Sequence, residues 1–273
     1  MKYTLNSPPS IRTDVRPTPR ELRWFAHIDR HGPQSSEFLY ECTRDTHRCR
    51  DTSLRRLQGL REAGYLRLPP QQRQIAKADF NPFVYDLTTL GWNVLADHQD
   101  LERHCRPTGH WWHGFWVSAV SSAIEITATR AGLTYIPAAK ILAIKGVDIA
   151  IPVGGSKLIP DQLFAIKYPD GYRAFALEVD RGTEPMRSVA ARKSCQSSVK
   201  QYRQLLTERQ FQKHYGLKSN VAVLWVFNSI ARHHQFKNII GCNDLRFATA
   251  SAQCFFPNWM QIQLLSHDLK IFP

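Results

Sequence analysis

Three carboxylates in one short stretch of the chain, Asp161, Glu178 and Asp180, have the residue type and spacing of a metal site. A Pro-Asp-Gly turn at 169–171 lies near the middle of the 17 positions from Asp161 to Glu178, which predicts a β-hairpin. A hairpin places the start of its first strand opposite the end of its second, so Asp161 and Glu178 should lie side by side. Carboxylate oxygens at a strand end are the hard ligands that Mg²⁺ or Mn²⁺ takes, with positions left for water and phosphate.

Acidic residues are scarce elsewhere in this half of the chain. Only ten fall in residues 113–273, and Glu184 joins the three carboxylates at the same hairpin end. The whole chain has 36 Lys and Arg against 23 Asp and Glu, a net charge of +13, which indicates a nucleic acid or an anionic membrane as partner. Clustered acids repel a polyanion unless a cation bridges them, and this favours a metal site.

The elements expected around the hairpin follow the order helix, three strands, helix, strand. Their segments are 113–132 (helix), 134–145, 157–167 and 172–180 (strands), 186–215 (helix) and 220–227 (strand), with one or two added strands in 238–273. The segment YRAFALEVD at 172–180 is apolar enough for the centre of a sheet. Glu178 inside it is costly unless it binds a metal or pairs with a cation such as Arg181 or Lys193.

The N-terminal part has the pattern of a winged helix-turn-helix. Helices are expected after Thr18, after Ser35 or Ser36, and from Thr52 to Ala63, followed by a strand at 82–87 and a closing helix. This divides the chain into a flexible arm (1–17), the winged helix (18–96), a linker (97–112) and a second domain (113–273). The start of its third helix normally meets the DNA major groove, and the residues there are Arg48, Arg50, Thr52, Ser53, Arg55 and Arg56. Binding of a protein by this domain is the alternative.

A second set of basic residues lies beside the proposed metal site. The helix expected from 186 carries many cations and little opposing charge, which suits a phosphate backbone better than a solvated helix face. The residues that we expect to contact DNA there are Arg181, Arg192, Lys200 and Arg203.

The chain resembles the PD-(D/E)xK nuclease fold and, more closely, the replication-relaxation family of plasmid and mobile-element proteins. The resemblance covers about 18–227 and rests on IPDQLFAI, LEVDRGTEP, Lys193, Tyr202 and the winged helix. It implies an α/β (α+β) two-domain chain whose second domain is a restriction-endonuclease-like αβββαβ core with a mixed central sheet. It also implies that Asp161 and Glu178, with Asp180 beside them, hold Mg²⁺ or Mn²⁺.

The candidate catalytic set is Asp161, Glu178, Asp180, Lys193 and Tyr202. Asp180 stands where the nuclease motif has a lysine, which normally orients the attacking water and offsets charge on the phosphate. Lys193 is the first choice to replace it, followed by Arg181 or Arg192. Tyr202 is either a relaxase nucleophile or a packing residue with its hydroxyl near the site.

No apolar run approaches the ~20 residues of a membrane span, and the first twenty residues lack the apolar block of a signal peptide. The six cysteines are scattered without a CxxC pair, which favours reduced thiols. We therefore expect a cytoplasmic protein with no membrane partner.

The leading hypothesis is a relaxase-like endonuclease that binds double-stranded DNA and nicks one strand, in the replication or transfer of a plasmid or mobile element. A non-catalytic replication initiator or transcriptional regulator with a degenerate nuclease domain is the alternative, and an endonuclease that cuts both strands is a third reading. Other replication or mobilisation proteins and a second copy of the chain are further candidate partners.

Overall fold

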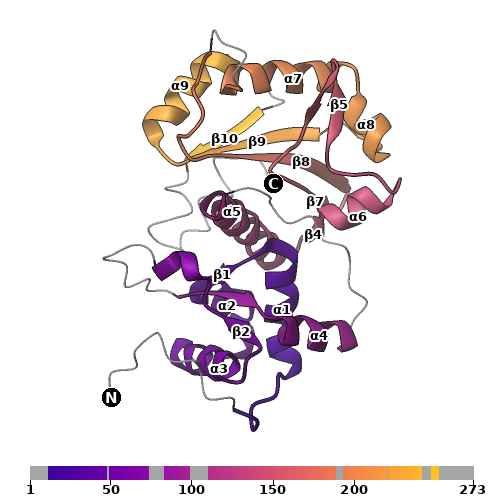
Figure 1. Cartoon of the computed structure of the whole chain (residues 1–273). Coiled ribbons are helices and arrows are strands. Elements are labelled where there is room, and N and C mark those ends of the chain that lie inside the picture. The colour runs from indigo at the N-terminus through magenta and orange to yellow at the C-terminus, as the bar shows by residue number, and fades with distance from the viewer. Residues whose placement is uncertain are drawn as a thin grey trace. The chain divides into compact units, whose positions relative to one another are not determined.

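The chain divides into two compact units, Met1–Glu102 and Arg103–Pro273 (Figure 1). The structure is a computed structural model. It describes residues 12–47, 49–73, 83–98, 110–188, 193–219, 221–241 and 247–251.

The N-terminal unit combines helices with a small antiparallel sheet whose strand order is β1-β3-β2. Its elements in chain order are α1 (Pro19–His31), β1 (Gln34–Ser35), α2 (Ser36–Cys42), the short 3₁₀ helix η1 (Arg44–Thr46), α3 (Arg50–Glu62), β2 (Leu66–Arg67), the 3₁₀ helix η2 (Pro70–Arg73), β3 (Val84–Leu87) and α4 (Thr89–His98).

The start of α1 follows from its sequence. Pro19 takes the first helical position, where a missing N–H costs nothing. The carboxylate of Glu21 accepts a hydrogen bond from the backbone N of Thr18 at 2.7 Å, which satisfies a donor that the helix leaves open. The buried face of α1 includes Trp24, whose ring N–H donates to the backbone O of Leu39 at 2.7 Å. This face forms the core of the unit with α3, β2 and β3.

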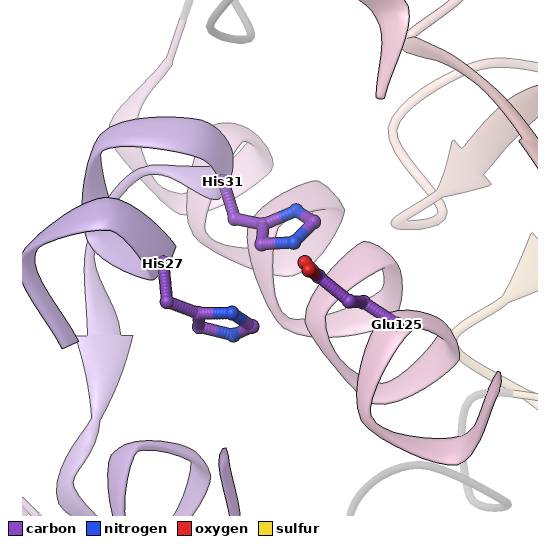
Figure 2. Close-up of side chains that lie close together, drawn as sticks. All are labelled: His27, His31 and Glu125. Carbon is purple, nitrogen blue, oxygen red and sulfur yellow. The ribbon is translucent and has the colours of Figure 1, made fainter. Parts of the chain in front are cut away.

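Two imidazoles share one face of α1, as Figure 2 shows. His27 and His31 are one helical turn apart, both are buried, and their ring centroids lie 4.7 Å from each other in an edge-to-face arrangement. Figure 2 also draws Glu125, which belongs to a helix of the C-terminal unit.

The described end of the expected N-terminal arm lies against α3. The backbone N of Arg12 donates to the backbone O of Glu62 at 3.2 Å, and Val15 belongs to the buried core of the unit. Residues 1–11 of that arm, and most of the expected linker 97–112, lie outside the described residues.

The C-terminal unit is built on a mixed sheet with strand order β10-β9-β8-β7-β4. The strands β4 and β8 run antiparallel to β7, while β9 and β10 continue the sheet in parallel with β8. Its elements in chain order are α5 (Trp111–Arg130), β4 (Thr134–Pro137), α6 (Ala138–Ala143), β5 (Ile151–Val153), β6 (Ser156–Leu158), β7 (Gln162–Tyr168), β8 (Gly171–Asp180), α7 (Cys195–Thr207), α8 (Gln210–Tyr215), β9 (Val221–Phe227), α9 (Ile230–Ile240) and β10 (Phe247–Ser251).

Helices cover both faces of this sheet. α5 packs against β4, β7 and β8 on one face, and α7 and α9 lie on the other (Figure 1). The strand β8 is buried along its last seven residues, as its apolar sequence predicts for a central strand. The described chain is therefore a mixed α/β protein. The start of β7 and the end of β8 lie between helices on opposite faces of the sheet.

Several elements differ from expectation, and the strand expected at 157–167 is two strands, β6 and β7, separated by residues 159–161. The strand expected at 134–145 ends at Pro137 and gives way to α6, because Ala-Ala-Lys-Ile-Leu-Ala is a run of strong helix formers after a proline. The helix expected at 186–215 begins only at Cys195 and breaks at Arg209, which adopts a left-handed conformation with φ of 55°. The helix α9 was not expected and lies mostly before residue 238, whereas β10 is one of the added strands expected in 238–273.

Among the described residues, we find no helix with both the length and the apolar character needed to cross a membrane.

Candidate active site

Asp161 and Glu178 meet at one end of the β7–β8 hairpin. Gln162 of β7 pairs with Leu177 of β8, so the next residues outward, Asp161 and Glu178, stand opposite each other. The turn at 169–170 closes the other end of this hairpin and sets the register. The hairpin geometry expected from the sequence is the one that the structure has.

Two elements hold the carboxylate of Asp161. The backbone N of Val179 in β8 donates to Oδ2 at 2.7 Å, and Oδ1 lies 2.8 Å from Nε2 of His113, in the first turn of α5. A carboxylate only accepts, so Nε2 of His113 carries the proton in this contact. The hydrogen bond to Asp161 raises the pKa of His113, against the lowering effect of its partial burial.

Glu178 is a buried carboxylate with a buried partner. Its side chain is 7% exposed, and Oε1 accepts a short hydrogen bond from the hydroxyl of Tyr202 in α7, which is fully buried. Burial and the neighbouring negative charge of Asp161 raise the pKa of Glu178 well above its ordinary value, although Lys193 and Tyr202 oppose the shift. Burial and Glu178 likewise raise the pKa of Tyr202.

Lys193 supplies positive charge to this end of the hairpin. Its Nζ lies 3.1 Å from Oε1 of Glu184. Partial desolvation lowers the pKa of Lys193, but the carboxylates of Glu178 and Glu184 outweigh it, and the net pKa is raised. The structure therefore brings Asp161, Glu178, Lys193 and Tyr202 of the expected catalytic set together.

Asp180 binds other residues than Asp161 and Glu178 do. Both of its oxygens are bound by Arg232 of α9, with Nη2 to Oδ2 at 2.5 Å and Nε to Oδ1 at 3.2 Å. Cys195 lies 3.3 Å from the same Oδ2, and burial together with Asp180 raises the pKa of the Cys195 thiol to about 12. The guanidinium of Arg232 also donates to the backbone O of Glu184 at 2.7 Å. The pair thus fixes the segment after β8 instead of adding a third carboxylate to Asp161 and Glu178.

The expected DNA contacts of the N-terminal unit fall into distinct environments. Arg55 is exposed on α3, and Ser53 is fully buried. Nε of Arg50 donates to Glu37 at 2.7 Å, and Thr52 lies 3.3 Å from the sulfur of Cys49.

Arg56 is held inside the N-terminal unit. Its Nε lies 3.2 Å from Oε1 of the fully buried Glu21, and its Nη2 donates to the backbone O of Arg16. The expected contact Arg48 lies outside the described residues. Arg55 is therefore the arginine of α3 best placed to meet a ligand.

The expected DNA contacts of the C-terminal unit also include both exposed residues and a residue bound within the unit. Lys200 is exposed on α7, and Arg181 is partly exposed directly after β8. Arg203 donates to the backbone O of Ile240 at 2.7 Å, and its guanidinium lies 5.9 Å from the ring centroid of Phe247. Arg203 therefore packs the C-terminal elements together. Arg192 lies outside the described residues.

Two residues of this region were not assigned to the site from the sequence. His113 precedes Asp161 by 48 positions, and Arg232 follows Asp180 by 52. The sequence offers only a weak signal for either, since a histidine in a first helical turn and an arginine in a helix are common.

The fold and the site define a mixed α/β protein in which a buried glutamate, Glu178, and a partly buried aspartate, Asp161, stand together at the ends of two central strands. A family model described as replication-relaxation matches residues 25–221. This is well over half of the chain, and the chain therefore belongs to the replication-relaxation family. Membership implies a role in the replication or relaxation of mobile elements. No curated protein and no solved structure matches the chain.

Proposed function

We propose that the protein is a metal-dependent, relaxase-like endonuclease that nicks one strand of double-stranded DNA. The observation that carries this proposal is the pairing of Asp161 and Glu178 at the hairpin end. The N-terminal unit, with its order α1-β1-α2-α3-β2-β3, is read as a winged helix that finds the DNA site. The C-terminal order α5-β4-β7-β8-α7-β9, apart from the insertion between β4 and β7 and the short helix α8, supports a restriction-endonuclease-like core.

The donor set fits Mg²⁺ or Mn²⁺. Two carboxylates stand side by side, and burial together with the charge of Asp161 raises the pKa of Glu178, a cost that a bound cation would offset. Each oxygen of Asp161 accepts one hydrogen bond and retains a lone pair. Among the described residues, Oε2 of Glu178 has no hydrogen-bond donor. A divalent cation there would bind phosphate and lower the pKa of a bound water.

The other residues of the site have supporting roles in this proposal. Asp180 stands at the position where the nuclease motif has a lysine, and it binds Arg232. Lys193 therefore provides the positive charge that the motif lysine supplies in the nuclease fold. Tyr202 holds Glu178 by its hydroxyl. Lys200 and Arg181 offer charge to the DNA backbone.

A plasmid nicking assay tests the proposal. Purified full-length protein is incubated with a supercoiled plasmid that carries the replication or transfer region of the element encoding the protein. The buffer contains EDTA, Mg²⁺ or Mn²⁺. We expect open-circular product only with a divalent cation, and loss of that product with Asp161→Ala while DNA binding persists. Nicking in EDTA, or full nicking by Asp161→Ala, would contradict this site. Linear product would identify an enzyme that cuts both strands.

The Tyr202→Phe variant is expected to keep measurable nicking. Tyr202 is fully buried with its hydroxyl on Glu178, so attack by water fits the geometry better than attack by this tyrosine. Loss of that one hydrogen bond should slow nicking roughly tenfold, in line with ~1–2 kcal/mol. The rate is measured beside Tyr172→Phe, a change at a partly exposed tyrosine whose hydroxyl binds the backbone N of Lys218. Complete loss of nicking, with protein attached to the DNA end in wild type, would assign Tyr202 as the nucleophile.

The Arg55→Ala variant is expected to weaken DNA binding without loss of stability. Arg55 is exposed on α3, and an arginine that reads a guanine contributes ~1–3 kcal/mol, about 5- to 150-fold in affinity. Affinity is measured by fluorescence anisotropy on a duplex selected by the wild-type protein from a random pool. Arg56→Ala is the contrasting variant, because it removes a partner of the buried Glu21 and should lower the melting temperature. Unchanged affinity in Arg55→Ala would argue against α3 as the reading helix.

The non-catalytic alternative is favoured by one observation. Asp180 occupies the position of the motif lysine and binds Arg232. A protein that binds a defined DNA sequence but cuts with no divalent cation would be a replication initiator or regulator.

A further inference from the structure

The carboxylate of Asp161 is fixed from two directions. Asp161 lies one residue before β7, so the strand's own pairing does not determine its rotamer. Val179 of β8 donates to one oxygen at 2.7 Å, and Nε2 of His113 lies 2.8 Å from the other. Two donors on separate oxygens set the plane of the carboxylate and leave one lone pair on each oxygen.

His113 is suited to hold this geometry because its helix is anchored. α5 packs along β4, β7 and β8, and most of its residues from Phe115 to Ala128 are buried. The side chain of His113 is 27% exposed, so its hydrogen bond to Asp161 is partly shielded from water. The bond therefore links the face of the sheet covered by α5 to the hairpin end, while Tyr202 approaches Glu178 from α7 on the other face.

We propose that His113 is a positioning residue, which holds Asp161 in the orientation that binds a divalent cation opposite Glu178. The inference rests on the proposed function and extends it to a helix outside the hairpin. Partners that orient a metal ligand typically contribute 10- to 100-fold in metal affinity. Glutamine at this position would place an amide N–H near the location of Nε2, whereas leucine fills similar space with no donor.

Mn²⁺ binding to the full-length protein, measured by calorimetry and electron paramagnetic resonance without DNA, tests the inference. We expect His113→Leu to weaken Mn²⁺ binding about 10- to 100-fold and His113→Gln to recover most of it. The nicking rate of His113→Leu should return toward wild type as Mn²⁺ is raised, since only the occupancy of the site is impaired. Circular dichroism and the melting temperature establish that both variants are folded.

The Asp161→Asn variant separates the proposed metal site from the proposed role of His113. If Asp161→Asn loses Mn²⁺ binding but His113→Leu binds as wild type does, the role of His113 is overturned and the metal site stands. Equal weakening in His113→Leu and His113→Gln also overturns it, because a restored donor should then have helped. If Asp161→Asn binds Mn²⁺ as wild type does, the proposed metal site fails and the role of His113 fails with it.

Discussion

Replacing Glu178 by glutamine is expected to abolish nicking and, at the same time, to raise the melting temperature of the protein in EDTA. Glutamine keeps the shape of the Glu178 side chain and still accepts a hydrogen bond from the hydroxyl of Tyr202. It removes the buried negative charge beside Asp161. Loss of a metal ligand should cost on the order of 10³-fold or more in nicking rate. Removal of a buried charge that Lys193 and Tyr202 offset only in part should add about 1 kcal/mol or more of stability, roughly 2–4 °C.

The sign of this stability gain depends on pH. The folded protein raises the pKa of Glu178, so ionisation at neutral pH destabilises the folded state. The advantage of Glu178→Gln should therefore be largest at pH 7–8 and vanish toward pH 4.5, the ordinary value for glutamate, where both side chains are neutral. Melting curves across this range in EDTA measure it.

Asp170→Asn is the matched control for Glu178→Gln. Asp170 is an exposed acid in the turn at the opposite end of the same hairpin. Its loss changes the net charge equally but should leave both nicking and the melting temperature near wild type. A lowered melting temperature in Glu178→Gln would mean that the carboxylate stabilises the fold, and the case for a cation site would be lost.

The pairing of Asp161 with Glu178 could be predicted from the sequence because the signals are local. A turn of Pro-Asp-Gly between two apolar runs sets the hairpin register, and register alone places these two residues opposite each other. The order of the helices and strands that carry the site follows from periodicity and strand composition in the same way, whereas the mixed sheet was expected only from the family resemblance.

The partners of these residues could not be predicted because they come from distant parts of the chain. Whether Asp180 faces a metal or Arg232 depends on how α9 packs on the sheet, which no pattern near Asp180 records. Similarly, Arg55 and Arg56 are neighbours of one type, yet only Arg56 meets the buried Glu21. Their difference comes from helical phase combined with tertiary packing.

Replacing Arg232 by alanine is expected to destabilise the protein by about 3–5 kcal/mol. Arg232 binds both oxygens of Asp180, whose side chain is 4% exposed, and its removal leaves a buried carboxylate without a counter-ion. It also removes a donor from the backbone O of Glu184, in the segment that leads toward Lys193. Urea unfolding monitored by tryptophan fluorescence measures the loss. Arg187→Ala, at an exposed arginine of the same segment, is the control and should stay within about 0.5 kcal/mol of wild type.

The double variant Asp180→Asn with Arg232→Ala distinguishes a structural pair from a metal ligand. Without the buried charge, the double variant should be less destabilised than the sum of the two single changes, because each single change leaves a partner unsatisfied. Asp180→Asn alone should lower stability yet retain Mn²⁺ binding and nicking in the folded fraction. If Asp180→Asn instead abolishes Mn²⁺ binding with stability unchanged, Asp180 is a third metal ligand and its bond to Arg232 must open when the cation enters.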